Sequence, residues 1–225
     1  MTAVTIAGQV AAMADAYAGQ PPEEVMGAFA REQAELAAGG IPEAVIAAGA
    51  VLPDADLLDR FGAPATLHDA IGDRPAVVVL YRGAWCPYCN ITLRTYQSEL
   101  LPELTRRGVA LVAISPQRPD GSLTMQEKND LTFTVLSDPG NQVARAAGVL
   151  SAPSSQVRAA QLQLGLDLRT VNADGTAGVP MPTTMIIDAH HVVGCIDVHP
   201  DYSTRSEPGQ ILAALEVTAL GRTGQ

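Results

Sequence analysis

The sequence is poor in charged and aromatic residues, in cysteine and in basic clusters. Charged residues make up 17% of the 225 residues and aromatic residues 4%, and the formal net charge is −10. A nucleic-acid-binding surface needs clustered Lys and Arg, so this composition argues against such a partner. The three cysteines are too few for a secreted scaffold held together by disulfides.

The sequence also lacks long apolar runs. None approaches the roughly 20 residues that are needed to cross a bilayer, so we expect no membrane segment. The first twenty residues contain no basic residue and no strong apolar core, which is unlike a signal peptide. We therefore expect a cytoplasmic protein. Hydrophobic residues at 47% are sufficient for a packed core.

Residues 1–50 are rich in Ala and Gly and predict a helical extension before a main domain at 51–225. Pro22 suits the first turn of a helix, and Gly39-Gly40 supplies a stop. Residues 41–49 repeat this pattern on a smaller scale. The extension has no Cys or His. We expect its apolar faces to pack on the domain or on a partner, of which a homodimer is one case, rather than to serve the chemistry.

From Pro53 onward the pattern alternates between strands and helices. Continuous apolar runs predict buried strands at 76–81, 109–115 and 131–138. We expect the helices at 87–107, 122–130, 141–148 and 154–166. A hairpin is predicted at 183–198, followed by a last helix that begins at Glu207. This order is typical of an α/β fold with a central mixed sheet flanked by helices.

The stretch YRGAWCPYCN, residues 81–90, carries the main chemical signal. Cys86 lies just beyond a predicted strand and at the start of the next helix, where the helix terminus favours a thiolate and lowers the cysteine pKa. Arg82 can add a positive charge. Cys89 is nearly one helical turn away, close enough for a disulfide. We interpret Cys86 as the nucleophile and Cys89 as its resolving partner.

Other interpretations of these residues are open. A Cys-x-x-Cys pair is half of a zinc site, but the four histidines and Cys195 show no spacing that would complete it, so we expect no metal. We expect no other cofactor, because no Gly-rich phosphate loop is present. Cys195 fits plain packing in a strand. Trp85 either packs under the loop or shields the thiol, and Arg82 either forms a structural ion pair or stabilises a thiolate.

Pro182 stands immediately before a predicted strand. A cis Met181–Pro182 bond would turn the exposed edge of that strand towards a neighbouring loop. The alternative is an ordinary trans proline at a strand start. We expect Pro182 and the adjacent Thr183 to support the site.

Five segments carry a family resemblance. In chain order they are YRGAWCPYCN, VAISPQRPDG, VLSDPGNQVARAAGV, MPTTMIID and DVHPDYSTRSEP. With them the chain resembles the peroxiredoxin-like proteins of the alkyl hydroperoxide reductase and thiol-specific antioxidant family, over about residues 53–220. The resemblance implies a thioredoxin fold, a peroxidatic cysteine at Cys86 and a cis proline at Pro182 facing it.

The chain departs from this family at two places. Typical members have Pro seven and Thr or Ser three residues before the reactive cysteine, where this chain has Val79 and Gly83. They also have an Arg just before the late strand, where this chain has Met181 and Pro182. The hydroxyl and the Arg orient the peroxide oxygens in the family, and we expect Arg82 to take over part of that task. The Cys-Pro-Tyr-Cys motif itself is similar to that of thioredoxin and glutaredoxin.

We therefore expect a thiol-dependent peroxidase that reduces hydrogen peroxide or organic hydroperoxides through Cys86. The resulting sulfenic acid condenses with Cys89, and a thioredoxin-like or low-molecular-weight thiol reopens the disulfide. Two alternatives stay open. One is a thiol–disulfide oxidoreductase with little peroxidase activity, and the other is a non-catalytic redox-sensing or interaction module.

Overall fold

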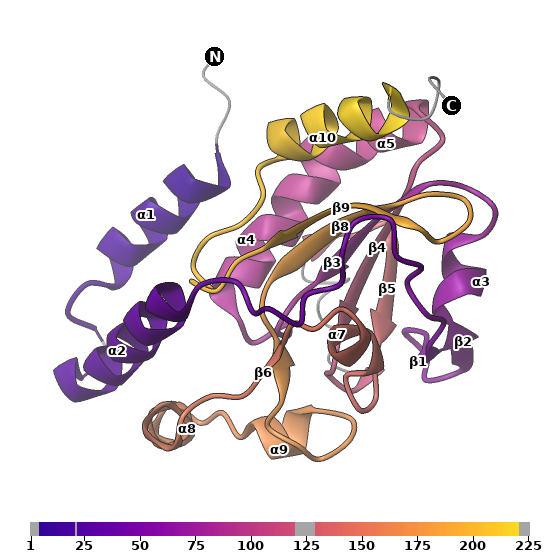
Figure 1. The fold of residues 1–225 in the computed structure, drawn as a ribbon. Helices are drawn as coiled ribbons and strands as arrows, with labels where there is room; N and C mark the ends of the chain where they lie inside the picture. Colours follow the sequence, from indigo (N-terminus) through magenta and orange to yellow (C-terminus); the bar gives the residue numbers. More distant parts are fainter. Residues whose placement is uncertain (1–4, 21, 120–128, 221–225) are drawn as a thin grey trace.

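The computed structural model describes residues 5–20, 22–119 and 129–220. Within these residues a mixed sheet has the strand order β2-β1-β5-β4-β3-β8-β9 (Figure 1). Strands β3, β4 and β5 run parallel, and the other pairs are antiparallel. The predicted α/β fold with a mixed sheet is confirmed. The strands are β1 Asp56–Leu58, β2 Pro64–Thr66, β3 Ala76–Leu80, β4 Ala110–Ser115, β5 Thr134–Ser137, β8 Thr183–Ile187 and β9 Val193–Val198.

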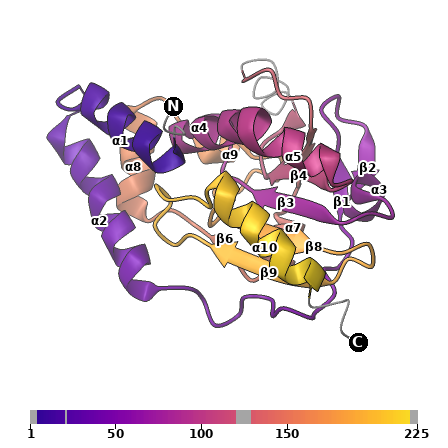
Figure 2. The same ribbon diagram turned by 90° about the horizontal axis from the view of Figure 1, so that it is seen from above.

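Strand β3 is buried on both faces because helices cover both sides of the sheet. Val77 and Val79 pack on one side, and Val78 and Leu80 on the other, as the period of two along a strand requires. The first side is covered by α4 Pro87–Thr95, the π-helical segment η1 Tyr96–Leu100, α5 Leu101–Arg106 and α10 Pro208–Leu220 (Figure 2). The second is covered by α3 Leu67–Ile71 and α7 Gln142–Ala146.

The predicted helix at 87–107 is present as the continuous run α4, η1 and α5. It opens into the π-helical turn just before Pro102. Proline has no N–H to donate, and its ring collides with the carbonyl of the residue four positions earlier, so a regular α-helix cannot pass through this point. Gly108, with φ +68°, follows the end of the run.

Two helices precede the sheet, α1 Ile6–Tyr17 and α2 Glu23–Gly39. Helix α1 packs against α4. Its first turn is capped from far along the chain, because the Glu207 carboxylate accepts the N–H groups of Ile6 and Ala7, both at 2.9 Å. The division of the chain into an extension and a domain at residue 51 stays a prediction.

Helix α2 packs against α8 Ser155–Gln163, and both views place the two side by side (Figures 1 and 2). Val25 and Ala28 of α2 form a small apolar cluster with Val157 and Ala160 of α8. This contact joins the N-terminal segment to the part of the chain beyond β5. A short two-stranded sheet of β6 Leu150–Ser151 and β7 Val179–Pro180, and the helix α9 Leu168–Val171, complete this region.

The short helix expected at 41–49 is absent, and this prediction is wrong. The segment forms turns whose backbone bonds to the main domain: Ile46 N–H donates to the Ala147 carbonyl at 3.1 Å, and Gly49 N–H to the Val193 carbonyl at 2.7 Å. Backbone donors engaged in this way cannot continue a helical ladder. The helix expected at 122–130 falls largely on residues 120–128, outside the described residues.

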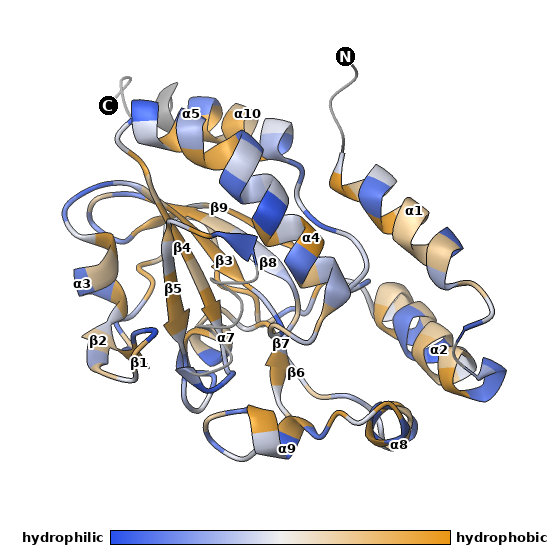
Figure 3. Cartoon of the chain, turned by 180° about the vertical axis from the view of Figure 1, so that it is seen from behind, coloured by the Kyte–Doolittle hydropathy of each residue, from blue (hydrophilic) through white to orange (hydrophobic). Residues whose placement is uncertain are grey.

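Hydropathy differs between the sheet and its covering helices. In Figure 3 strands β4 and β5 are mainly hydrophobic, whereas helix α4 mixes hydrophobic and hydrophilic residues. In the part of the chain that the structure describes, no helix is both long and apolar enough to cross a membrane.

Gly148 provides a test of how residues 41–49 are held. It has φ +71°, and a Cβ there would overlap the backbone of Ala44. Gly108 has a similar φ of +68° but open space around it. We expect Gly108→Ala to lower the free energy of unfolding by about 1 kcal/mol through backbone strain alone. Gly148→Ala should cost at least about 2 kcal/mol more, because it adds overpacking. Urea unfolding measures both free energies. Equal losses in the two variants would contradict the close contact between Gly148 and Ala44.

Candidate active site

The two cysteines of the Cys-Pro-Tyr-Cys motif lie at the N-terminus of α4, at the end of the sheet where β3 stops. Cys86 is the N-cap residue and Pro87 the first residue of the helix, where its missing N–H costs nothing. Both cysteines are buried and reduced. Asn90 fixes the turn, because its side-chain amide donates to the Ala84 carbonyl at 2.9 Å and to the Cys86 carbonyl at 2.8 Å.

Arg205 is the cation that contacts the pair. Its Nη2 donates to the Sγ of Cys89 at 3.3 Å, while its Nη1 donates to the carbonyls of Tyr202 and Thr204, both at 2.6 Å. Burial alone would raise the pKa of Cys89. The hydrogen bond with Cys86 and the charge of Arg205 outweigh it and lower the pKa of Cys89 to about 5.

The predicted lowered pKa of Cys86 is wrong for the reduced pair. Burial raises the pKa of Cys86, and the hydrogen bond and negative charge of Cys89 raise it further. Two thiols in contact cannot both ionise easily, so the pair loses one proton at low pH and retains the other. Arg205 touches Cys89 and favours the negative charge on that sulfur. The pKa of Cys86 is raised beside it.

Arg82 lies between two aromatic rings. Its guanidinium carbon is 4.0 Å from the ring centroid of Tyr202 and 5.1 Å from that of Trp85. It is buried, and among the described residues it forms no ion pair. Of the two interpretations of Arg82, the structural ion pair is excluded within these residues. Arg82 lines the same cavity as Cys86.

Trp85 packs under the loop and explains one departure from the family pattern. A Cβ at Gly83 would overlap the indole of Trp85, and Gly83 has φ +148°, which L side chains rarely adopt. A Thr or Ser cannot occupy position 83 while the indole lies there. The hydroxyl typical of the family is therefore excluded by the packing of this loop.

The predicted cis proline is wrong. Among the described residues no peptide bond is cis, and the Met181–Pro182 bond is trans. The chain runs extended from β7 into β8: Met181 N–H donates to the Val149 carbonyl at 2.8 Å, and the Pro182 carbonyl accepts from His199 N–H at 2.9 Å. The Thr183 hydroxyl donates to the Met181 carbonyl at 2.9 Å. Pro182 lies near Arg82 but does not line the cavity that contains Cys86.

Cys195 lies apart from the pair. On β9 it stands opposite Ile186, three residues before Val198, which marks the end of the sheet nearest to the site. Three strand residues span about 10 Å. The side chain is half-buried, and burial together with the charge of Asp197 raises the pKa of Cys195. Within the described part of the chain, no three His, Cys, Asp or Glu side chains gather as metal ligands.

Cys86 opens onto a cavity of about 490 Å³, and Cys89 does not line it. The floor contains Arg82, Trp85 and Tyr202. The opposite wall comes from α2, through Met26 and Phe29, and from α8 and the turn that follows it. The second helix of the N-terminal extension thus forms a wall of the cavity. The expectation that the extension does not serve the chemistry stays a prediction.

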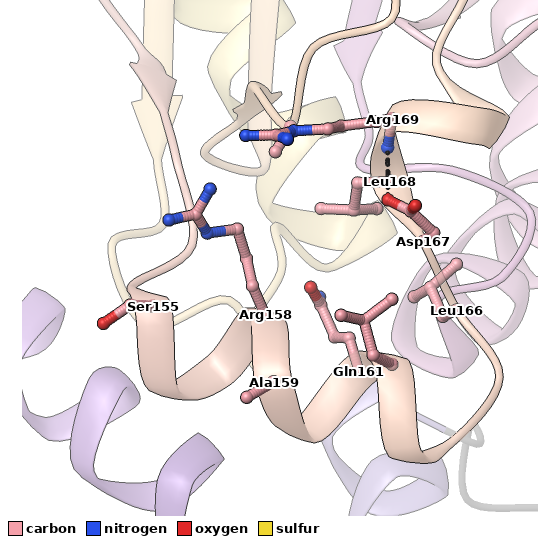
Figure 4. A pocket seen from close by; sticks show the side chains of 10 residues that line it. Ser155, Arg158, Ala159, Gln161, Leu166, Asp167, Leu168 and Arg169 are labelled. Atoms are coloured by element: carbon pink, nitrogen blue, oxygen red, sulfur yellow. Dashed lines mark hydrogen bonds between the residues drawn. The ribbon is translucent and has the colours of Figure 1, made fainter.

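A second, more polar cavity of about 260 Å³ lies on the other side of α8, between α8 and α9 (Figure 4). Arg158 and Arg169 line it, and both are exposed. It contains no cysteine. Gln161 lines both cavities, so α8 separates this space from the one above Cys86.

Arg205 and Tyr202 belong to the site, although the sequence did not indicate them as site residues. They belong to the segment DVHPDYSTRSEP, which lies more than a hundred residues after Cys86. Their loop follows β9 at the same end of the sheet, and Asp197 anchors it by accepting the Ser206 hydroxyl at 2.7 Å. The only available signal was the family resemblance of this segment, which does not say where its side chains lie.

Known proteins resemble this chain over much of its length. Residues 48–196 match the AhpC/TSA family. Peroxiredoxin Bcp of Escherichia coli is 33% identical over 102 residues, which are 45% of this chain and 64% of that protein. The thiol-disulfide oxidoreductase ResA of Bacillus thuringiensis is 28% identical over 108 residues, 48% of this chain and 61% of its own. The chain thus spans somewhat less than two thirds of the length of these curated relatives.

Among solved structures, reduced Prx3 of Vibrio vulnificus in complex with H₂O₂ superimposes with a TM-score of 0.60 at 22% identity. The match covers 76% of this chain and 99% of that one. Such a likeness shows the fold, and it confirms the expected thioredoxin-like architecture of the peroxiredoxins.

The ionisation of the pair can be tested by pH titration of the thiolate ultraviolet absorbance of the reduced protein. We expect the first thiolate to form with an apparent pKa of about 5, so that it is present at pH 7 and disappears as the pH falls below 5. Arg205→Met should raise this pKa, because the thiolate loses its cation and a hydrogen-bond donor, and Arg205→Lys should raise it less. Cys195→Ser is the control that leaves the transition in place. An unchanged transition in Arg205→Met would refute the assignment.

Proposed function

Because this chain belongs to the AhpC/TSA family, we propose that it is a thiol-dependent peroxidase that reduces hydrogen peroxide or organic hydroperoxides. The observation that carries the proposal is that the two cysteines have different surroundings. Cys86 is the cysteine that lines an open cavity, and Cys89 is the buried partner beside Arg205. A peroxide that enters the cavity meets Cys86 first.

In the first step Cys86 passes its proton to the Cys89 thiolate along their hydrogen bond. The Sγ of Cys86 then attacks the terminal oxygen of the hydroperoxide, so that an S–O bond forms and the O–O bond breaks. The leaving alkoxide, or hydroxide from hydrogen peroxide, takes the proton back from Cys89. The products are an alcohol or water, a sulfenic acid on Cys86 and a thiolate on Cys89.

In the second step the Cys89 thiolate attacks the sulfur of the Cys86 sulfenic acid. The S–S bond forms, the S–O bond breaks, and hydroxide leaves as water after it takes a proton from solvent. A thioredoxin-like or low-molecular-weight thiol supplies two electrons to restore the dithiol by exchange. We place this cycle in the cytoplasm, where such thiols are kept reduced.

We assign to Arg82 the role of contacting the peroxide oxygens. Its guanidinium is buried beside Cys86 without an ion-pair partner in the described residues, and a positive charge there stabilises the alkoxide that leaves in the first step. This assignment would compensate for the hydroxyl that Trp85 excludes from position 83 and for the Arg that is absent before β8.

A second candidate function is thiol–disulfide exchange. The Cys-Pro-Tyr-Cys motif, the absence of a hydroxyl at position 83 and the similarity to a protein called a thiol-disulfide oxidoreductase support it. In that reaction Cys86 would attack a disulfide sulfur instead of a peroxide oxygen. Rates of peroxide consumption and of insulin-disulfide reduction, measured on the same preparation, separate the two functions.

The nucleophile is tested by Cys86→Ser. We expect the second-order rate of peroxide reduction to fall by about a thousandfold or more, because a serine hydroxyl cannot replace a thiolate here. Stopped-flow fluorescence of Trp85, the sole tryptophan, follows the reaction. Cys195→Ser serves as a matched control and should retain the wild-type rate. Wild-type activity in Cys86→Ser would mean that another residue attacks the peroxide.

The resolving residue is tested by peptide mapping without reduction after mild peroxide treatment. We expect a Cys86–Cys89 disulfide to dominate, since the two side chains are already in contact in the reduced protein. Cys89→Ser should leave Cys86 as a sulfenic acid that dimedone traps. A dominant link from Cys86 to Cys195, or to a second chain, would overturn the assignment of Cys89.

A further inference from the structure

The cavity above Cys86 is much larger than hydrogen peroxide requires. Its volume of about 490 Å³ lies within the range of roughly 300–1,000 Å³ typical of sites for drug-sized ligands. Hydrogen peroxide has only two non-hydrogen atoms, both oxygen, and needs only polar contacts beside the sulfur. A cavity of this size provides room for an organic body attached to the reacting oxygens.

The outer walls of the cavity are apolar. Helix α2 contributes Met26 and Phe29, and the turn after α8 contributes Leu164 and Leu166. Met26 is 46% exposed and Leu164 53% exposed, so large apolar side chains reach the solvent at the mouth of the cavity. Apolar surface in this position is stabilised when an apolar ligand covers it.

The charges around the cavity restrict the ligand further. Arg82 is the only charged residue among those that line it in the described part of the chain. The cavity therefore disfavours a cationic ligand and places its single positive charge on the floor, next to Cys86. A hydroperoxide group fits at this charged end, and an apolar body fits against α2.

Helix α2 is held firmly enough to form such a wall. Its cluster with α8 buries Val25 and Ala28 on one side, and the Tyr202 hydroxyl donates to the Phe29 carbonyl at 3.4 Å on the other. Tyr202 also contacts the Arg82 guanidinium. The wall and the floor of the cavity are thus joined through one residue.

We propose that α2 makes the cavity a specificity site for bulky, apolar organic hydroperoxides and favours them over hydrogen peroxide. The proposal rests on the peroxidase function proposed above. The organic body packs against Phe29, Met26 and Leu164 while the terminal oxygen meets Cys86. Once the O–O bond has broken, the corresponding alcohol stays in contact with the same side chains until it leaves. The N-terminal segment, rather than the cysteine motif, then sets the preference among peroxides.

The preference is tested with cumene hydroperoxide and hydrogen peroxide, by the second-order rate of the Trp85 fluorescence change in the full-length reduced protein. We expect the wild type to react faster with cumene hydroperoxide. Phe29→Ser should reduce the ratio of the two rates about tenfold, the scale of losing an apolar contact in a substrate pocket. Glu35→Ser, at an exposed position of α2 outside the cavity, is the matched control and should leave the ratio unchanged. Leu164→Ser, in the turn after α8, replaces Phe29→Ser if that variant does not fold.

A binding measurement separates this proposal from the peroxidase function. In the Cys86→Ser protein, cumyl alcohol should change the fluorescence of Trp85 with saturation, and adding Phe29→Ser should weaken this binding about tenfold. If wild-type protein reacts with no peroxide but the alcohol still binds in this way, the peroxidase function fails and the apolar site stands. If peroxides react while the alcohol does not bind and the two rates are equal, the specificity site is refuted and the peroxidase function stands.

Discussion

The site depends on one electrostatic arrangement, a buried pair of thiols that shares a single negative charge beside Arg205. Two ionised sulfurs in contact would repel each other strongly in a buried environment, and one charge without a cation would be costly to bury. The hydrogen bond from Arg205 to Cys89 at 3.3 Å favours the charge on Cys89. Cys86 lines the cavity, and in the mechanism that we propose its activation is a proton transfer inside the pair.

The same arrangement accounts for the geometry of the surrounding loops. Arg205 reaches Cys89 because its loop is anchored to Asp197 at the end of β9 and is held by its own bonds to two backbone carbonyls. Arg82 fills the other side of the site by stacking on Tyr202 from this same loop. The loop after β9 therefore supplies the cation of one cysteine and positions the guanidinium that faces the other.

Trp85 shows how one residue can alter a family pattern. Its indole occupies the space above Gly83, so position 83 has no side-chain hydroxyl and the floor of the cavity has an aromatic ring. The wall from α2 is a second difference from the family pattern. The residues that match the family begin at position 48, and α2 lies before them. Both features contribute to a cavity of about 490 Å³ with apolar walls beside Cys86.

The sequence by itself determined the order of the core strands β3, β4, β5, β8 and β9, the cysteine pair at a helix start and the family, because apolar periodicity, helix-end chemistry and motif spacing are local. Tertiary structure alone decided which sulfur lies beside a cation, since Arg205 lies 116 residues from Cys89. It also decided that the bond before Pro182 is trans, because backbone hydrogen bonds to distant strands keep that segment extended. The wall formed by α2 likewise depends on α8, a contact between segments that no local pattern encodes.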